Sequence, residues 1–196
     1  MQDTFSEVLA ETRAGDLCID LGAIVGSITK RMALTGADVI SFEPDPAAFA
    51  VLQDTVRDLN NVTLVQKAAG HQPNSLLLYR SAKWSPDDPS GRTQSSSLVL
   101  RDKDANDENA VRVEVVDIIA YLEALDRDIR IIKMDIEGAE WDILTRLVDH
   151  PILSRIDCIF VETHERQDPK RYVPMFEAFQ NWAEKIERPY IHLYWV

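Results

Sequence analysis

Two stretches of the chain combine residue types and spacings that can do chemistry, and the first is segment 17–43. In it, an apolar run that contains Asp20 breaks into Gly22 and Gly26, and a second apolar run ends at Glu43. Glycine lacks a Cβ atom, so such a turn can bend sharply and let a ligand approach the backbone. An acid at the tip of the second strand is placed to accept hydrogen bonds from a ribose diol. The segment therefore predicts a nucleoside site.

The spacing of the two glycines narrows the class of ligand. A dinucleotide fingerprint needs three glycines as G-x-G-x-x-G, whereas residues 23–25 separate Gly22 from Gly26 without a middle glycine. The Gly-Lys-Ser/Thr of a phosphate-binding P-loop is also absent from the sequence. The remaining possibility is a site for a nucleoside ligand that has no pyrophosphate, and S-adenosylmethionine (SAM) is such a ligand. A tight strand-to-helix turn with no ligand is the alternative.

The second stretch consists of polar residues that follow or end two later apolar runs, 129–134 and 156–161. These residues are Lys133, Asp135, Glu137, Glu162 and His164. The carboxyl ends of parallel strands meet at one edge of a sheet, so we expect these side chains near the glycine turn. Methyl transfer from a sulfonium to a hydroxyl needs oxygen, carbon and sulfur in line, and a general base helps to remove the hydroxyl proton.

Each of these polar residues has a predicted role and a structural alternative. We predict that Asp135 lines the methyl-transfer site and that His164 or Asp135 takes the proton, since a histidine pKa of about 6.5 suits a base. Lys133 is the third catalytic candidate, and pairing with a neighbouring acid is its alternative. Glu137 and Glu162 are assigned to substrate binding, although Glu137 could instead cap the following helix. His164 could equally be a solvated residue of a charged loop.

Oxygen and imidazole ligands also suit a divalent cation such as Mg²⁺ or Mn²⁺. Asp135, Glu162 and His164 could supply such a site, and activity that is lost with a chelator and restored by Mg²⁺ would support it. Our primary interpretation assigns no metal ligand.

The elements that must position these residues alternate between strand-like and helix-like patterns. Strands are expected at 17–21, 38–42, 62–65, 76–79, 111–115, 129–134, 156–161 and 191–195, with a further candidate at 97–100. Helices are expected at about 3–13, 25–34, 45–59, 117–125, 141–148 and 169–186, and Asp45, Asp117 and Asp168 stand at the start of three of them. Strands that alternate with helices predict a Rossmann-like, doubly wound, mostly parallel α/β sheet in three layers.

A polar stretch at about 80–110 interrupts this alternation. Loops this long inside compact domains are usually functional or disordered. We expect a solvated segment, and the alternative is a lid over the ligand site in which Trp84 stacks on a substrate ring. The sequence offers no other linker, so residues 1–196 are predicted to form one domain.

The charge balance disfavours several classes of partner. The chain has 196 residues, with 21 Lys and Arg against 33 Asp and Glu, and a formal net charge of −12. Without a dense Lys/Arg run, binding to nucleic acid or to an anionic membrane is disfavoured. Apolar runs stay well below the ~20 residues that span a bilayer, and the N-terminus does not resemble a secretory signal. We expect a cytoplasmic protein that acts on a small molecule, with its oligomeric state left open.

The two cysteines agree with a reducing compartment. Cys18 and Cys158 fall in two of the predicted strands, and in a sheet with strand order 3-2-1-4-5 one strand would separate them, which places them roughly 9–10 Å apart. A disulfide needs Cα atoms closer than about 7 Å. Both are therefore predicted to be buried and reduced.

Taken together, these motifs resemble the FkbM-type SAM-dependent methyltransferases. The blocks that carry the resemblance are 20–26 (DLGAIVG), 42–44 (FEP), 66–70 (QKAAG), 95–98 (SSSL) and 133–140 (KMDIEGAE), within about Leu17 to Glu165. The resemblance implies O-methylation of a hydroxylated product, such as a sugar, lipid-linked glycan or polyketide, and a sheet with strand order 3-2-1-4-5. The family usually has Asn where this chain has Ile24, a change that removes an amide beside the methionine part of the cofactor.

The resemblance also implies which residues contact SAM. They are Asp20, Gly22, Ala23, Gly26, Glu43, Pro44, Lys67 and Ala68. Asp20 is expected to fix the glycine loop and the amino-acid end of the cofactor. The favoured interpretation is a SAM-dependent O-methyltransferase with a small hydroxylated substrate. The rivals are an NAD-dependent oxidoreductase, which shares the strand-terminal acid, and a non-catalytic SAM-binding subunit, which Ile24 favours.

Overall fold

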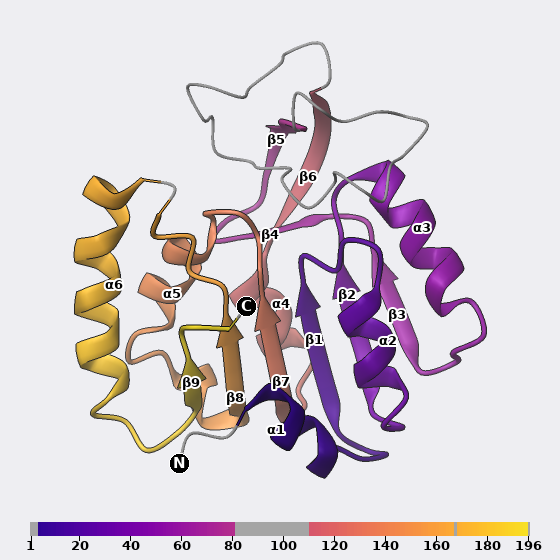
Figure 1. The fold of residues 1–196 in the computed structure, drawn as a ribbon, viewed down its shortest axis with the longest axis horizontal. Helices are drawn as coiled ribbons and strands as arrows, with labels where there is room; N and C mark the ends of the chain where they lie inside the picture. Colours follow the sequence, from indigo (N-terminus) through magenta and orange to yellow (C-terminus); the bar gives the residue numbers. More distant parts are fainter. Residues whose placement is uncertain (1–3, 81–109, 167, 196) are drawn as a thin grey trace.

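The central strands of the main sheet are apolar and buried along almost their whole length, as strands covered by helices on both faces must be. The computed structural model describes residues 4–80, 110–166 and 168–195. In spatial order, the strands of the sheet are β3 (Val62–Val65), β2 (Asp38–Phe42), β1 (Leu17–Leu21), β7 (Ile129–Met134), β8 (Ile156–Val161) and β9 (Tyr190–His192) (Figure 1). Every residue of β1, at the centre, is buried.

All neighbouring strands of this sheet run parallel. The predicted order 3-2-1-4-5 is therefore confirmed, with β7 and β8 as the fourth and fifth strands and β9 added at the edge. Because the strands are parallel, their carboxyl ends lie along one edge of the sheet, at the top of Figure 1. The predicted doubly wound α/β class is confirmed as well.

Helices cover both faces of the sheet. One layer contains α1 (Phe5–Glu11), α2 (Ser27–Ala33) and α3 (Pro46–Val56), and the other contains α4 (Ile118–Ala124), α5 (Glu140–Leu147) and α6 (Pro169–Ala183). Among the described residues, no helix combines the length and the apolar character that a membrane span requires.

Side-chain caps begin three of these helices where the sequence predicted. The Asp45 carboxylate accepts a hydrogen bond from the backbone N–H of Ala47, and a proline follows at the first helical position. Asp117 caps α4 and Asp168 caps α6 in the same way. Each cap satisfies a backbone donor that would otherwise lack a partner. The predicted starts are confirmed.

A second, smaller sheet stands beyond the carboxyl edge of the main one (Figure 1). Its order is β4 (Ala68–Gly70), β6 (Val111–Asp117) and β5 (Asn74–Leu78). The strands expected at 76–79 and 111–115 thus pair with each other, antiparallel, outside the main sheet. The candidate strand at 97–100 and Trp84, with most of the predicted 80–110 insertion, lie outside the described residues.

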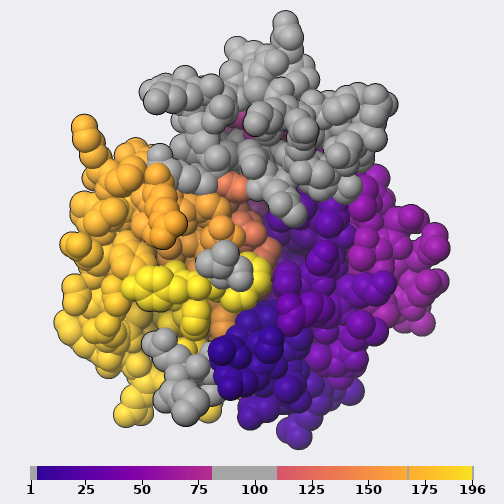
Figure 2. All heavy atoms as spheres, viewed as in Figure 1, coloured from indigo at the N-terminus to yellow at the C-terminus, as the bar shows by residue number. Residues whose placement is uncertain are grey.

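The edge of the sheet at β9 differs from the prediction of a strand over 191–195. The ladder with β8 ends where Phe160 faces His192. The chain then turns, and Tyr194 makes an antiparallel bridge with Glu162. The last residues (yellow) pass toward the N-terminal residues (indigo) in Figure 2, and the ring of Trp195 lies 5.9 Å from that of Phe5.

The two cysteines lie on strands that flank β7. Cys18 and Cys158 both pair in register with Ile131, so one strand separates them. Both are buried and neither forms a disulfide, as predicted. Burial raises the pKa of the Cys18 thiol to about 12.

Candidate functional site

The glycine turn after β1 packs closely against two neighbouring parts of the chain, the end of β7 and helix α3. Gly22 has φ +80°, and a Cβ atom there would lie 1.8 Å from the carbonyl oxygen of Asp135. Gly26 has φ +89°, and a Cβ atom there would lie 2.6 Å from the Leu52 side chain of α3. The position of a Cβ atom at Gly26 is thus occupied by α3, so this residue must be glycine for the turn to pack against that helix. Gly22 joins the turn directly to the end of β7.

A network of buried polar side chains stabilises the same turn. Asp20 is fully buried and Lys133 is 2% exposed. The Lys133 ammonium donates a hydrogen bond to the Gly22 carbonyl at 2.6 Å and lies 3.2 Å from the Asp20 carboxylate. The hydroxyl of Thr29, in α2, donates to the other Asp20 oxygen at 2.7 Å. Asp20 is therefore connected to the loop through Lys133, which donates to the Gly22 carbonyl.

The position of Lys133 corresponds to the structural alternative stated for it. Besides Asp20, its ammonium lies 3.7 Å from Asp135 and 5.5 Å from the centre of the Trp195 ring. A buried ammonium with these partners has little access to a substrate. We therefore describe Lys133 as a residue that positions the loop.

Glu43 closes the turn from the tip of β2. One carboxylate oxygen accepts the Ile24 N–H and the other accepts the Asp45 N–H, both at 2.8 Å. The residue is 6% exposed, and burial raises the pKa of its carboxyl to about 8 although the two hydrogen bonds oppose the rise. Each carboxylate oxygen has a second lone pair that a ribose hydroxyl can use. Glu43 is therefore oriented toward the glycine turn.

The other residues predicted to contact SAM are more dispersed. Ala23 packs against α3, and Pro44 follows Glu43 at the end of β2. Ala68 is buried in β4, and the half-exposed Lys67 forms an ion pair with Glu114, so both belong to the second sheet.

Arg80 is a residue that the sequence analysis missed. Its guanidinium binds both oxygens of the buried Asp45 carboxylate, each at 2.7 Å. This bidentate bond ties the segment after β5 to the segment after β2, next to Glu43. Arg80 falls inside the stretch expected to be a polar insertion, where no sequence pattern indicates this pairing.

Four acids gather around one imidazole at the ends of β7 and β8. We name the set the His164 cluster, and its members are Asp135, Glu137, Glu140, Glu162 and His164. The His164 Nε2 atom lies 3.7 Å from Asp135, 3.5 Å from Glu137 and 3.7 Å from Glu162. The structure thus brings together the predicted catalytic pair and the two predicted substrate-binding acids.

Glu140 is the member of the cluster without a predicted role. It is fully buried, and its two oxygens accept the N–H groups of Ile136 and Gly138 at 2.8 and 2.7 Å. Its Oε1 also lies 3.1 Å from Nδ1 of His164. Glu140 therefore binds the backbone N–H groups before α5, close to the role offered as the alternative for Glu137. Its place as the first residue of α5 was the available signal.

Backbone strain marks the same corner. Ile24, Glu137 and His164 have φ values of 53°, 58° and 49°, in the left-handed region that non-glycine residues rarely adopt. Such strain persists only where surrounding contacts impose it, and it concentrates at functional sites. The glycine turn and the His164 cluster are linked through Asp135, which lies 3.7 Å from both the Lys133 ammonium and the His164 ring.

The electrostatics of the cluster changes the choice of base. Burial alone would lower the pKa of His164, but the hydrogen bond to Glu140 and the surrounding carboxylates raise it to about 9. At neutral pH the imidazole then carries its proton and cannot accept another. Burial raises the pKa of Asp135 above its usual value, against the opposing effect of Lys133 and His164. Of the two predicted bases, Asp135 is the better candidate.

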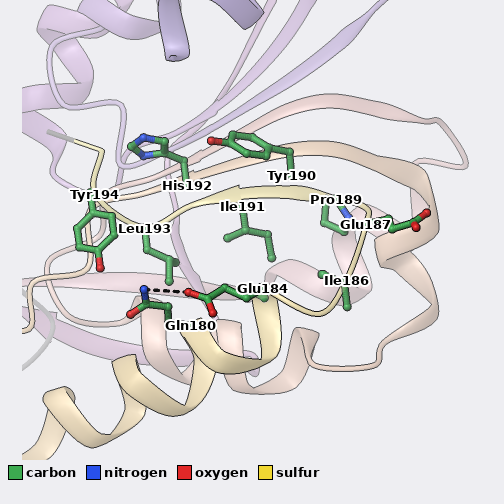
Figure 3. A pocket seen from close by; sticks show the side chains of 11 residues that line it. Gln180, Glu184, Ile186, Glu187, Pro189, Tyr190, Ile191, His192, Leu193 and Tyr194 are labelled. Atoms are coloured by element: carbon green, nitrogen blue, oxygen red, sulfur yellow. Dashed lines mark hydrogen bonds between the residues drawn. The ribbon is translucent and has the colours of Figure 1, made fainter. Parts of the chain in front are cut away.

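A cavity of about 220 Å³ lies elsewhere, between α6 and β9 (Figure 3). Ile191 and Leu193 point toward α6, while Tyr190 and His192 point to the opposite side of the strand (Figure 3). None of the residues that line this cavity belongs to the glycine turn or to the His164 cluster. The cavity is therefore separate from the candidate site.

Comparison with known proteins places the chain among methyltransferases. The model of the family described as "Methyltransferase FkbM domain" matches residues 20–189. "Methyltransferase 1" of Beauveria bassiana is 25% identical over 189 residues, which cover 87% of this chain and 74% of that protein.

Two further matches are more limited. "Ribosomal RNA small subunit methyltransferase A" of Streptococcus sanguinis is 39% identical over 49 residues, so the match spans 25% of this chain and only 17% of that relative's length. The crystal structure of a precorrin-6y C5,15-methyltransferase from Geobacter metallireducens aligns with a TM-score of 0.43 and 13% identity, covering 89% of this chain and 68% of that chain.

Proposed function

The chain belongs to the FkbM methyltransferase family, and we propose that it uses SAM to methylate a hydroxyl of a small acceptor. The observation that carries this proposal is the pairing of Glu43 with the glycine turn. A buried carboxylate that accepts the Ile24 N–H presents its remaining lone pairs at the turn itself. A ribose diol offers the two donors that such a carboxylate would accept.

The residues at the turn fit the nucleoside part of the cofactor. Glu43 would hold the ribose, and the turn that Asp20 and Lys133 support would lie against the rest of the nucleoside. When bound, SAM supplies a methyl group activated by a positively charged sulfur. The carboxylates of the neighbouring His164 cluster would stabilise that positive charge.

The proton of the acceptor hydroxyl needs a destination, and Asp135 is the group that we assign to this step. Its carboxylate stands between the glycine turn and the His164 cluster. The raised pKa makes it a stronger base than an ordinary aspartate. General base catalysis of this kind contributes typically ~10²–10⁴-fold to the rate.

The charge of the site also bears on the acceptor. Four carboxylates at the strand ends, together with the net charge of −12, favour neutral or cationic acceptors over polyanions. We therefore propose a small hydroxylated molecule and not a nucleic acid.

Calorimetric titration with S-adenosylhomocysteine tests the cofactor assignment. We expect the wild-type chain to bind it and not NADH. Glu43→Ala should weaken binding by roughly 10- to 100-fold, because it removes two hydrogen bonds to the ribose, each worth about 0.5–1.5 kcal/mol. Glu123→Ala, at an exposed acid of α4, is the matched control. Absence of S-adenosylhomocysteine binding, or binding of NADH in its place, would refute the proposal.

Transfer of a labelled methyl group tests the reaction itself. The wild-type chain is incubated with methyl-labelled SAM and a panel of hydroxylated acceptors. With any acceptor that is methylated, Asp135→Asn should reduce turnover by at least 100-fold while S-adenosylhomocysteine still binds. Unchanged turnover in this variant would remove Asp135 from the role of base.

A further inference from the structure

We propose that the His164 cluster binds one divalent cation, for which Mn²⁺ is the suitable probe. This departs from the primary interpretation of the sequence, which assigned no metal ligand. The cluster presents mixed donors, an imidazole nitrogen together with carboxylate oxygens. Asp135, Glu140 and His164 each place a ligand atom within 4.8 Å of those of the other two.

The orientation of the imidazole is the observation that points to a ligand. The His164 side chain is 8% exposed, and its Nδ1 atom lies 3.1 Å from both Glu140 Oε1 and the Glu162 carbonyl oxygen. A ring that donates from Nδ1 to these acceptors turns Nε2 toward the remaining carboxylates, and a cation bound there would displace the proton that Nε2 otherwise carries. Metal-binding histidines are commonly held in this way, by a carboxylate or carbonyl on the nitrogen away from the metal.

The spacing around Nε2 suits coordination better than hydrogen bonding. Its distances to the carboxylates of Asp135, Glu137 and Glu162 are 3.5–3.7 Å, longer than the about 2.7–3.2 Å of hydrogen bonds. A cation with ligand bonds of about 2.0–2.2 Å places adjacent ligand atoms roughly 3.0–3.5 Å apart. A small inward movement of these carboxylates would therefore complete a coordination shell with Nε2.

The charge of the cluster adds a driving force. Four carboxylates surround a single imidazole, and Lys133, the cation beside Asp135, is shared with Asp20. A divalent cation would compensate this excess of negative charge. Carboxylate oxygens suit Mg²⁺ and Mn²⁺, and an imidazole ligand suits transition metals, so the mixed set favours Mn²⁺ over Mg²⁺.

Within the cluster, Glu140 differs from the other acids. Both of its oxygens already accept backbone N–H groups, and one of them faces Nδ1. We assign it the role of a positioning residue that holds the ring. If the proposed methyl transfer holds, a cation at this place would bind the acceptor hydroxyl and lower its pKa, so that the proton leaves more readily. The binding of the cation itself does not depend on that function.

Titration with Mn²⁺, followed by the electron paramagnetic resonance signal of the free ion, tests the site on the full chain without SAM. We expect one tight site per chain. Asp135→Asn and Glu162→Gln should each weaken it by about 10-fold or more, and Mg²⁺ should displace Mn²⁺ at higher concentration. Asp142→Asn is the matched control, because this acid of α5 pairs with His71, outside the cluster.

Circular dichroism and thermal unfolding establish that each variant folds. Glu162, whose side chain is 37% exposed, is the substitution least expected to disturb folding. Absence of a stoichiometric site in the wild type, or equal affinities in Glu162→Gln and Asp142→Asn, would overturn the inference. Titration of the same sample with S-adenosylhomocysteine separates the two proposals. If the chain binds S-adenosylhomocysteine but not Mn²⁺, only the metal site is overturned. If it binds Mn²⁺ but not S-adenosylhomocysteine, only the proposed use of SAM is overturned.

Discussion

Replacing Ile24 by glycine and by alanine measures the strain stored in the glycine turn. Ile24 has φ +53°, a conformation that is costly for a β-branched residue, and its N–H donates to Glu43. Both variants remove the side chain beyond Cβ, so they lose nearly the same burial. Only glycine removes the Cβ atom that makes the left-handed conformation unfavourable.

The expected size of the effect follows from that single difference. A left-handed conformation costs roughly 1–2 kcal/mol for a residue with a Cβ atom. Glycine loses more conformational freedom on folding, which offsets this gain by about 0.5–1 kcal/mol. We therefore expect Ile24→Gly to exceed Ile24→Ala in the free energy of unfolding by about 0.5–1 kcal/mol. For a chain of this size, that is roughly 1–4 °C in Tm.

Urea unfolding of the two variants, followed by circular dichroism, provides the comparison. Ile24→Asn extends it, since Asn adopts the left-handed region more readily than Ile, and we expect it to tighten binding of S-adenosylhomocysteine. Ile24→Val keeps the β-branched strain and serves as the control. If Ile24→Ala proved as stable as Ile24→Gly, the turn would not be strained in solution and the reasoning would fail.

Three further predictions concern the same site. Gly22→Ala should abolish S-adenosylhomocysteine binding or soluble expression, because its Cβ would lie 1.8 Å from the Asp135 carbonyl oxygen; normal binding would contradict this. Lys133→Met should lower the free energy of unfolding by about 3–5 kcal/mol by leaving Asp20 buried without its cation, and adding Asp20→Asn should restore part of it. The pKa of Glu43 is about 8 in the folded chain against roughly 4.3 in the unfolded chain. The protonated side chain therefore stabilises the fold at low pH, and this contribution is lost as the pH rises through 8. Glu43→Gln should therefore flatten the fall of stability with pH in urea titrations, and an unchanged profile would refute the shift.

Local rules in the sequence were sufficient for much of the architecture. An aspartate followed by a helical pattern predicted the starts of α3, α4 and α6, because capping involves only residues two or three positions apart. Continuous apolar runs predicted the buried strands β1, β7 and β8. The alternation of strands and helices then predicted a doubly wound parallel sheet, whereas its strand order was implied by the resemblance to the FkbM-type methyltransferases.

The sequence also predicted that the candidate residues lie together, because parallel strands bring their carboxyl ends to one edge whatever their spacing along the chain. This is why Gly22, Glu43, Asp135 and His164 could be grouped without coordinates. The sequence alone does not indicate which of these side chains are ionised. The proton on His164 depends on carboxylates from two strand ends, and these distances exist only after folding.

Three roles depend on contacts between distant parts of the chain, and all three belong to buried polar groups. Lys133 pairs with Asp20, Arg80 pairs with Asp45, and Glu140 holds the His164 ring. In the sequence each of these is an ordinary charged residue, with no periodicity or spacing that identifies its partner. A buried charge is stable only beside its partner, and that partner comes from another element of the chain. Local pattern therefore determined the strands and the edge at which they end, whereas long-range packing determined which charges are paired there.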